Sequence, residues 1–398
     1  NPNYRGEAYP AEGEAGDASA SLLADAGKRM PFIDRVVFSR EREGIPYWNK
    51  FLQGYYDFSG ISSDSFDQAV RISVEGEAGV SPEMKAKGIK LEASVGTATR
   101  YFAFNWLDPV VGGGQVDAAG RERARKLRQA ISIALDWEEF ISIFANGRGI
   151  PAQGPIPPGI FGFRTGGEGI NPVVYDWADA APRRKSIAAA KKLLAEAGYP
   201  DGREAKSGQP LVLYLDTTDR GPGDKPRLDW YRKQFAKLDV QLEIRGTDYN
   251  RFQEKVRKGA AQIFVWGWNA DYPDPENFLF LFHGAQSRAK SQGENAANYA
   301  NPEYDRLFEQ VKHMENGPAR QALIDRMLAI LREDAPWSFG FHPKDYSLHH
   351  DWVANLKPNN MARNGLKYQK IDAARRERLR AEWNRPVLWP LGLLAVVL

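Results

Sequence analysis

Strands alternate with helices between residues 211 and 268, and this alternation limits the fold more than any other feature. Apolar runs at 211–215, 240–244 and 262–268 are expected to be strands. Helices are expected between them, at 227–238 and 249–258. Strands that alternate with helices of this length argue for an α/β layer that is partly parallel. The chain has 398 residues, which suffices for two or three domains.

Further strands, helices and connections are expected before residue 211 and after residue 268. A strand is expected at 32–38, and a long connection rich in Gly and Pro at 149–172. Asp136 is expected to cap a helix, because aspartate is a preferred N-cap residue. Further helices are expected at 121–144, 183–197, 303–314 and 318–333.

Composition excludes several classes of protein. The net charge of +3 is small for this length, so it does not indicate nucleic-acid binding. The chain has no cysteine, which excludes disulfides and thiolate chemistry from it. The 11 tryptophans and 16 tyrosines suit a protein that lines pockets with flat amphipathic rings.

The segment from Trp266 to Phe278 contains the end of the last expected strand and the turn that follows it. Asp271 lies just beyond Trp268, and ligands of open α/β sheets bind outside the carboxyl ends of strands. A carboxylate between aromatic rings is suited to hold a cationic group of a small ligand. In the alternative interpretation, Trp266 and Trp268 belong to the core and Asp271 only fixes the turn.

Asp274 is expected to have a structural role in the same segment. It precedes Pro275, and the order Asp-Pro is typical of an N-cap followed by the first residue of a helix. Asp271 and Asp274, or Glu43 and Asp57, could be proposed as the carboxylate pair of a glycosidase, but sequence does not show the separation that this chemistry needs. The capping role also explains Asp274 without catalysis. We therefore expect no enzyme.

Other polar clusters favour no cofactor or metal. His349, His350 and Asp351 resemble a metal cluster, but adjacent histidines in a strand point to opposite faces, so a solvated turn is expected instead. The triplet at 112–114 lacks the Lys and Ser or Thr that follow in a phosphate-binding loop.

The C-terminal segment differs from the rest of the chain. An arginine-rich helix at about 373–385 precedes a charge-free run at 386–398, which is shorter than the roughly 20 residues that span a bilayer. The run is expected to begin a truncated membrane anchor, and the alternative is a tail that docks on the protein. Arginines beside a span tend to be cytoplasmic, which counts against an anchor on the outer face.

Six segments carry motifs in a fixed order. They lie at 1–4, 51–57, 125–136, 147–158, 188–198 and 268–278. In this order they resemble "NPxYW", "LxxGxxD", "VRQALxxAID", "GxGxxAxGPIP", "AKKLLAEAGY" and "WxADYPDP" of the family 5 extracellular solute-binding proteins, the oligopeptide- and dipeptide-binding receptors of ABC importers. The first motif departs from that pattern, because Arg5 stands where the family has Trp.

The resemblance implies a two-lobe periplasmic binding protein of type II, the large peptide-binding class, with α/β lobes that close on a ligand. This chain would hold mainly the second lobe and part of the first. The implied division is the end of the first lobe and a linker at 1–30, the second lobe at 31–341, a return to the first lobe at 342–372, and the basic helix with its anchor at 373–398. The first half of the family sequence, with its export signal, would lie outside this chain.

The resemblance also implies a site and partners. Asp271 would receive the α-amino group of a peptide, and backbone groups around Trp268 and Asn269 would pair with its main chain as an added strand. Tyr249 would line the pocket. The implied function is delivery of oligopeptides or dipeptides to an ABC permease, outside the cytoplasmic membrane and tethered to it. The alternatives are a tethered ligand sensor or folding helper, or a receptor for a sugar, nickel chelate or opine.

Overall fold

The computed structural model describes residues 6–41, 44–73, 78–113, 117–219, 221–359, 361 and 364–386. The chain divides into two compact units. One unit is Val95–Lys344, and the other combines Asn1–Ser94 with Asp345–Leu398. Residues 31–94 thus group with the terminal segments, whereas the expected second lobe begins at residue 31. The lobe boundaries themselves stay a prediction.

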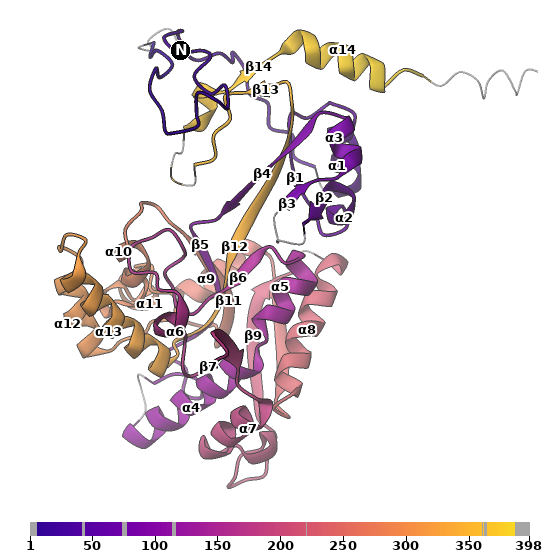
Figure 1. The fold of residues 1–398 in the computed structure, drawn as a ribbon. Coiled ribbons are helices and arrows are strands. Elements are labelled where there is room, and N and C mark those ends of the chain that lie inside the picture. The colour runs from indigo at the N-terminus through magenta and orange to yellow at the C-terminus, as the bar shows by residue number, and fades with distance from the viewer. Residues whose placement is uncertain are drawn as a thin grey trace, which may run out of the picture. The chain divides into compact units, whose positions relative to one another are not determined.

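The unit Val95–Lys344 is built on a mixed sheet (Figure 1). Its strands lie in the order β12-β5-β11-β9-β10, and β6 pairs with β12. Pairing is parallel between β10 and β9 and between β9 and β11, and antiparallel between β11 and β5 and between β5 and β12. These strands are β5 (Ala98–Phe104), β6 (Gly149–Pro151), β9 (Val212–Thr218), β10 (Gln241–Thr247), β11 (Ile263–Asn269) and the first half of β12 (Trp337–His350). The predicted α/β fold with a partly parallel sheet is confirmed.

Helices of this unit connect and cover the strands, and α8 and α9 are the predicted connections between β9, β10 and β11. Helices α12 and α13 pack side by side (Figure 1). The helices are α4 (Ala118–Ala134), α5 (Trp137–Ala145), α6 (Gly166–Gly169), α7 (Ile187–Glu196), α8 (Lys225–Ala236), α9 (Tyr249–Arg257), α10 (Glu276–Leu279), α11 (Arg288–Ser291), α12 (Pro302–Val311) and α13 (Pro318–Asp334). A hairpin of β7 (Tyr175–Ala178) and β8 (Ala181–Arg184) precedes α7.

Short local signals set where these helices begin and end. The carboxylate of Asp136 accepts a hydrogen bond from the Glu139 N–H over 2.9 Å, so its predicted N-cap role at α5 is confirmed. Asp248 caps α9 in the same way, through the N–H groups of Asn250 and Arg251. Gly198 follows α7 with φ of +94°, a left-handed conformation that glycine adopts without steric cost.

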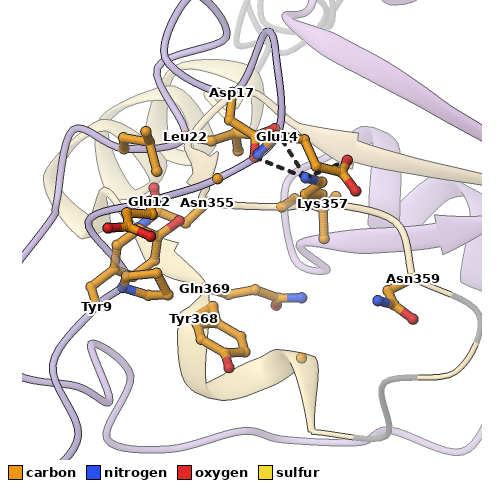
Figure 2. Close-up of a pocket in the computed structure, with 15 residues that line it drawn as sticks. Tyr9, Glu12, Glu14, Asp17, Leu22, Asn355, Lys357, Asn359, Tyr368 and Gln369 are labelled. Carbon is orange, nitrogen blue, oxygen red and sulfur yellow. Dashed lines mark hydrogen bonds and ion pairs between the residues drawn. The ribbon is translucent and has the colours of Figure 1, made fainter.

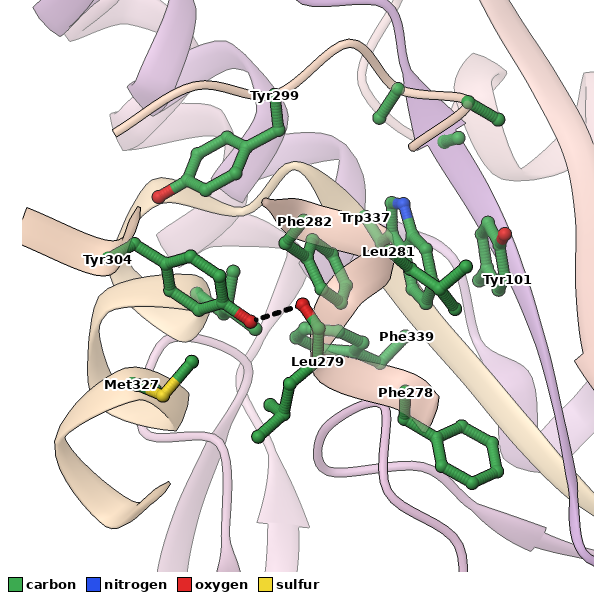
Figure 3. Packing of buried hydrophobic residues seen from close by; sticks show 14 of the residues in the cluster. Tyr101, Phe278, Leu279, Leu281, Phe282, Tyr299, Tyr304, Met327, Trp337 and Phe339 are labelled. Atoms are coloured by element: carbon green, nitrogen blue, oxygen red, sulfur yellow. Dashed lines mark hydrogen bonds between the residues drawn. The ribbon is translucent and has the colours of Figure 1, made fainter. Parts of the chain in front are cut away.

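The two faces of the sheet bury separate cores, because successive side chains of a strand point to opposite faces. On β5, Tyr101 enters one core and Phe102 the other. In the first core Tyr101 stacks on Trp337 with ring centroids 3.3 Å apart. There the Tyr304 hydroxyl donates to the Leu279 carbonyl over 2.8 Å (Figure 3). This core extends to the aromatic end of β11, since Trp266 and Trp268 pack against it.

The unit that combines the terminal segments has a small core of its own, which includes Phe51, Met84 and Leu348. Its strands β1 (Phe58–Gly60) and β4 (Ile89–Val95) pair with β12, and β2 (Val70–Ile72) pairs with β3 (Ala78–Val80). Strand β13 (Val353–Ala354) pairs with β14 (Lys370–Ile371). Its helices are α1 (Gly44–Leu52), α2 (Phe66–Ala69), α3 (Pro82–Ala86) and the predicted arginine-rich helix α14 (Ala373–Trp383).

Two expectations for this unit are wrong. Residues 32–38 form no strand, and Phe38 is 85% exposed. The apolar run suggested a strand, but in the described part of the chain this segment pairs with no other strand. His349 and His350 lie in β12 and are buried rather than in a solvated turn. The His350 Nε2–H donates to the Phe51 carbonyl over 2.9 Å, and the ring stacks on Trp352.

His342 gives the fold a pH dependence. Its Nδ1–H donates to the Ala98 carbonyl over 3.0 Å, and burial lowers the pKa of His342 to about 4. The unfolded chain takes up this proton near pH 6.5, so the unfolded state binds more protons between these values and stability falls with acidification. Between pH 7 and pH 5, the free energy of unfolding of His342→Gln should fall by about 1–2 kcal/mol less than that of the wild-type protein.

Chemical denaturation of both proteins at the two pH values measures this difference. The matched control is His313→Gln, which removes an exposed imidazole from the same unit. Identical pH profiles for the wild-type protein and His342→Gln would contradict the argument.

Candidate functional site at the carboxyl ends of β10 and β11

The predicted site residues lie at one edge of the sheet. Strands β9, β10 and β11 run parallel, so their carboxyl ends meet at the same edge. Tyr249 is two residues beyond the end of β10, and Asp271 is two residues beyond the end of β11. Trp268 and Asn269 are the last two residues of β11. The structure therefore brings all four predicted residues to the edge where α/β sheets bind ligands.

The Trp268 side chain is part of the packing at this edge. The residue is half-buried, and its ring meets Phe280 edge to face with centroids 5.5 Å apart. Its indole N–H donates to the side-chain oxygen of Asn277 over 3.2 Å. The core interpretation of the tryptophans thus holds for the Trp268 ring, and the expected role of its main chain in ligand binding stays a prediction.

Asn277 fixes the turn that carries Asp271. The side-chain oxygen of Asn277 also accepts from the Asp271 backbone N–H over 2.8 Å, and Asn277 is 2% exposed. A buried acceptor that binds two donors holds the backbone in one conformation, because leaving either buried donor without a hydrogen bond costs about 1–3 kcal/mol. Asp271 itself is exposed. The turn is therefore fixed by Asn277, which holds the backbone of the exposed Asp271 in place.

Asp274 has the structural role that the sequence predicts, but it lies one residue before the N-cap position and also pairs with an arginine. Its carboxylate accepts from the Glu276 N–H over 2.8 Å, but Pro275 rather than Asp274 is the residue that immediately precedes α10. Both carboxylate oxygens also accept from the guanidinium of Arg320 over 2.7 Å, and Arg320 is 3% exposed. Burial raises the pKa of Asp274, but the Arg320 guanidinium and the Glu276 N–H outweigh burial and hold it below its usual value.

The main chain of β11 has one edge that β9 covers only in part. Parallel pairing with β9 involves only Ile263 and Phe264 among the described residues, whereas β5 pairs along the whole strand. The Ala270 N–H donates to the Thr97 carbonyl of the chain before β5 over 2.8 Å. Main-chain groups alternate in direction along a strand, so those of Gly267 and Asn269 face away from β5. They point to the side of β11 that β9 leaves uncovered beyond Phe264.

Tyr249 is exposed at the same edge. It is the first residue of α9, and 58% of it is accessible. Its hydroxyl oxygen accepts from the Gln253 side-chain amide over 2.8 Å, one helical turn further on. The predicted pocket-lining ring is thus accessible, on a helix whose start Asp248 holds in place.

A cavity of about 400 Å³ lies in the other unit (Figure 2). Tyr9, Asn355 and Tyr368 are among its lining residues. The Lys357 ammonium lies 2.8 Å from Asp17 and 2.9 Å from Glu14, so opposite charges within its wall are already paired. None of the predicted site residues lines this cavity.

The described residues also bear on the metal and membrane questions. They contain no group of three or more His, Asp or Glu side chains arranged to hold a metal ion. None of the described helices combines the length and apolar character that crossing a bilayer requires. The expected anchor segment from residue 387 onward lies outside the described residues.

Comparison with known proteins relates this chain to bacterial solute-binding proteins. The family described as bacterial extracellular solute-binding proteins, family 5 Middle, matches residues 1–290. Heme-binding protein A of Haemophilus influenzae is 29% identical over 55% of this chain and 37% of its own length. Di/tripeptide-binding protein 2 of Pseudomonas aeruginosa is 25% identical over 62% of this chain and 43% of its own. The chain thus spans about two fifths of the length of these relatives.

Solved structures share the fold. The dipeptide-binding protein of a Pseudoalteromonas species in complex with Met-Leu aligns with a TM-score of 0.64 and 21% identity, over 88% of this chain and 60% of its own. A periplasmic binding protein of Helicobacter pylori in complex with the peptide STSA has a TM-score of 0.64 and 19% identity, over 83% and 56%. The predicted fold of a periplasmic binding protein is confirmed.

The two aspartates of the turn should differ in their effect on stability. Asp274→Asn leaves the buried Arg320 without its counter-charge and should lower the free energy of unfolding by about 2 kcal/mol, less than a fully buried pair because Asp274 is partly exposed. Asp271→Asn is the matched control and should change it by less than about 0.5 kcal/mol. Denaturant titration measures both. Equal losses would mean that Asp271 is structural.

Proposed function

The chain belongs to the bacterial extracellular solute-binding proteins of family 5, and from this premise we propose that the full-length protein is the substrate-binding component of an ABC importer for peptides. The observation that carries the proposal is the exposed Asp271 on a fixed turn, next to the partly uncovered edge of β11. The protein binds its ligand reversibly and performs no chemistry on it.

Main-chain pairing supports a peptide ligand. The backbone groups of Gly267 and Asn269 face away from β5, and an extended peptide added there gains main-chain hydrogen bonds that do not depend on its sequence. Such bonds let one receptor accept many peptides.

The Asp271 carboxylate supports recognition of the peptide's α-amino group. An ammonium group that leaves water needs a fixed counter-charge, and a charge-assisted hydrogen bond is about twice as strong as a neutral one. The carboxylate begins from a backbone that Asn277 already orders, so little conformational entropy is lost on binding. Tyr249 offers an exposed aromatic surface at the same edge for a ligand side chain.

The names of the relatives support this ligand class. Several are di/tripeptide- or dipeptide-binding proteins, and two of the structures that share the fold hold peptides. One relative is a heme-binding protein, which makes heme the non-peptide ligand to test beside peptides. In our proposal the receptor works in the periplasm, delivers peptides to permease subunits and is tethered by its C-terminal apolar run.

Replacement Asp271→Asn in the full-length protein tests the site. It should weaken the binding of a free-amine peptide by about 1.5–3 kcal/mol, which corresponds to one charge-assisted hydrogen bond. The same peptide with an acetylated N-terminus is the internal control and should bind the variant and the wild-type protein almost equally. Isothermal titration calorimetry measures both ligands. Equal losses for the two peptides would remove Asp271 from the binding site.

A further inference from the structure

Helices α5 and α8 lie side by side in the unit Val95–Lys344 (Figure 1), and a groove of about 400 Å³ lies between them. We propose that this groove is a docking surface for the permease, and that it takes an apolar side chain flanked by carboxylates on an extracytoplasmic loop of a permease subunit. This inference rests on the proposed function and adds the surface through which receptor and permease meet.

Aromatic rings line the groove. The Trp230 side chain of α8 is 5% exposed, and its ring lies next to that of Phe144 of α5, with centroids 6.2 Å apart. The indole N–H of Trp230 donates to the Glu139 carboxylate over 2.8 Å, so the ring is held in place without a partner. Ile143 also lines the groove and is 52% exposed. A fixed aromatic wall beside an exposed aliphatic side chain is suited to receive an apolar anchor residue, and a few such anchors dominate binding at protein interfaces.

The rim of the groove is basic. Lys225, Arg232 and Lys233 are all exposed on α8. Asp229 is the one carboxylate among the residues that line the groove, and it pairs with Lys225 and, over 2.9 Å, with Arg232. Lys233 lines the groove and makes no ion pair with another described residue. Three cations beside one carboxylate leave a positive rim, which favours an acidic partner and disfavours a basic one.

The groove lies near the edge at which the peptide is proposed to bind. Strand β9 ends at Thr218, and α8 begins at Lys225. The guanidinium of Arg227, in the first turn of α8, donates to the Thr218 carbonyl over 3.4 Å, so this end of the helix lies against the carboxyl end of β9. The carboxyl ends of β10 and β11 lie at the same edge. In this proposal the permease therefore contacts the receptor close to the point at which the ligand leaves it.

Two substitutions in the groove test the docking. Ile143→Asp places a carboxylate where an apolar, acidic segment is proposed to bind, and Lys233→Glu reverses a charge on the rim. Cells of the source organism that lack the chromosomal gene would carry each variant of the full-length protein, and uptake of a radiolabelled tripeptide would be measured. Both variants should lower the initial uptake rate by about fivefold or more. Calorimetry should show an unchanged affinity of each purified variant for the same tripeptide.

Matched substitutions away from the groove separate docking from general effects of charge and polarity. Lys206→Glu makes the same charge reversal at an exposed lysine in the connection before β9, near the amino end of that strand. Trp177→Asp places a carboxylate at another exposed apolar position, in β7. Both should leave uptake within about twofold of the wild-type rate. A photoreactive p-benzoylphenylalanine at position 143 should crosslink to a permease subunit, which mass spectrometry identifies.

The outcomes distinguish this inference from the proposed function. Unchanged uptake in either groove variant, or a crosslink from position 143 to a second copy of the receptor, would overturn the docking surface while peptide import stands. Loss of tripeptide affinity in either groove variant would also overturn it, because the groove would then belong to the ligand site or to the fold. Failure of the wild-type protein to bind the tripeptide or to restore uptake would overturn the proposed function and this inference together.

Discussion

Strand β11 pairs with β5 along its whole length but with β9 only at Ile263 and Phe264. The rest of the site depends on this difference. Pairing with β5 fixes the strand and sets the direction of every main-chain group, while the departure from β9 leaves one edge for a partner from outside the sheet. A strand edge with unpaired groups is ordinarily a liability for aggregation. In our proposal this edge, at the carboxyl end of the sheet, is where an extended peptide pairs as an added strand.

The polar residues of the turn after β11 have a structural role at Asp274 and, in our proposal, a binding role at Asp271. Asp274 and Asp271 are three residues apart, yet Asp274 is committed to the buried Arg320 and the start of α10, while Asp271 is exposed. The buried side chain of Asn277 connects the two roles, because it fixes the backbone of Asp271 without using its carboxylate. An anion held on an ordered backbone at the mouth of a site is the arrangement that binding a cationic group with little entropic cost requires.

Local signals in the sequence predicted most of this fold and the position of the four candidate site residues at one edge of the sheet. Apolar periodicity located the strands and helices, and the caps at Asp136 and Asp248 confirm that helix starts are set by nearby residues. The partners of the turn were not predictable in this way. Arg320 is 46 residues from Asp274, and Arg100 is 169 residues from Asn269, so only the folded chain brings them together. His349 and His350 were wrongly expected in a solvated turn, because a polar pair gives no sign of a strand that buries both faces.

The central claim is that the full-length protein is a receptor for peptides, and its natural cargo tests this most directly. The protein would be purified without added ligand and denatured, and the small molecules that it releases would be identified by mass spectrometry. The account predicts a mixture of short peptides with free amino termini. Release of a single non-peptide species, such as heme, would contradict it and leave only the fold in place.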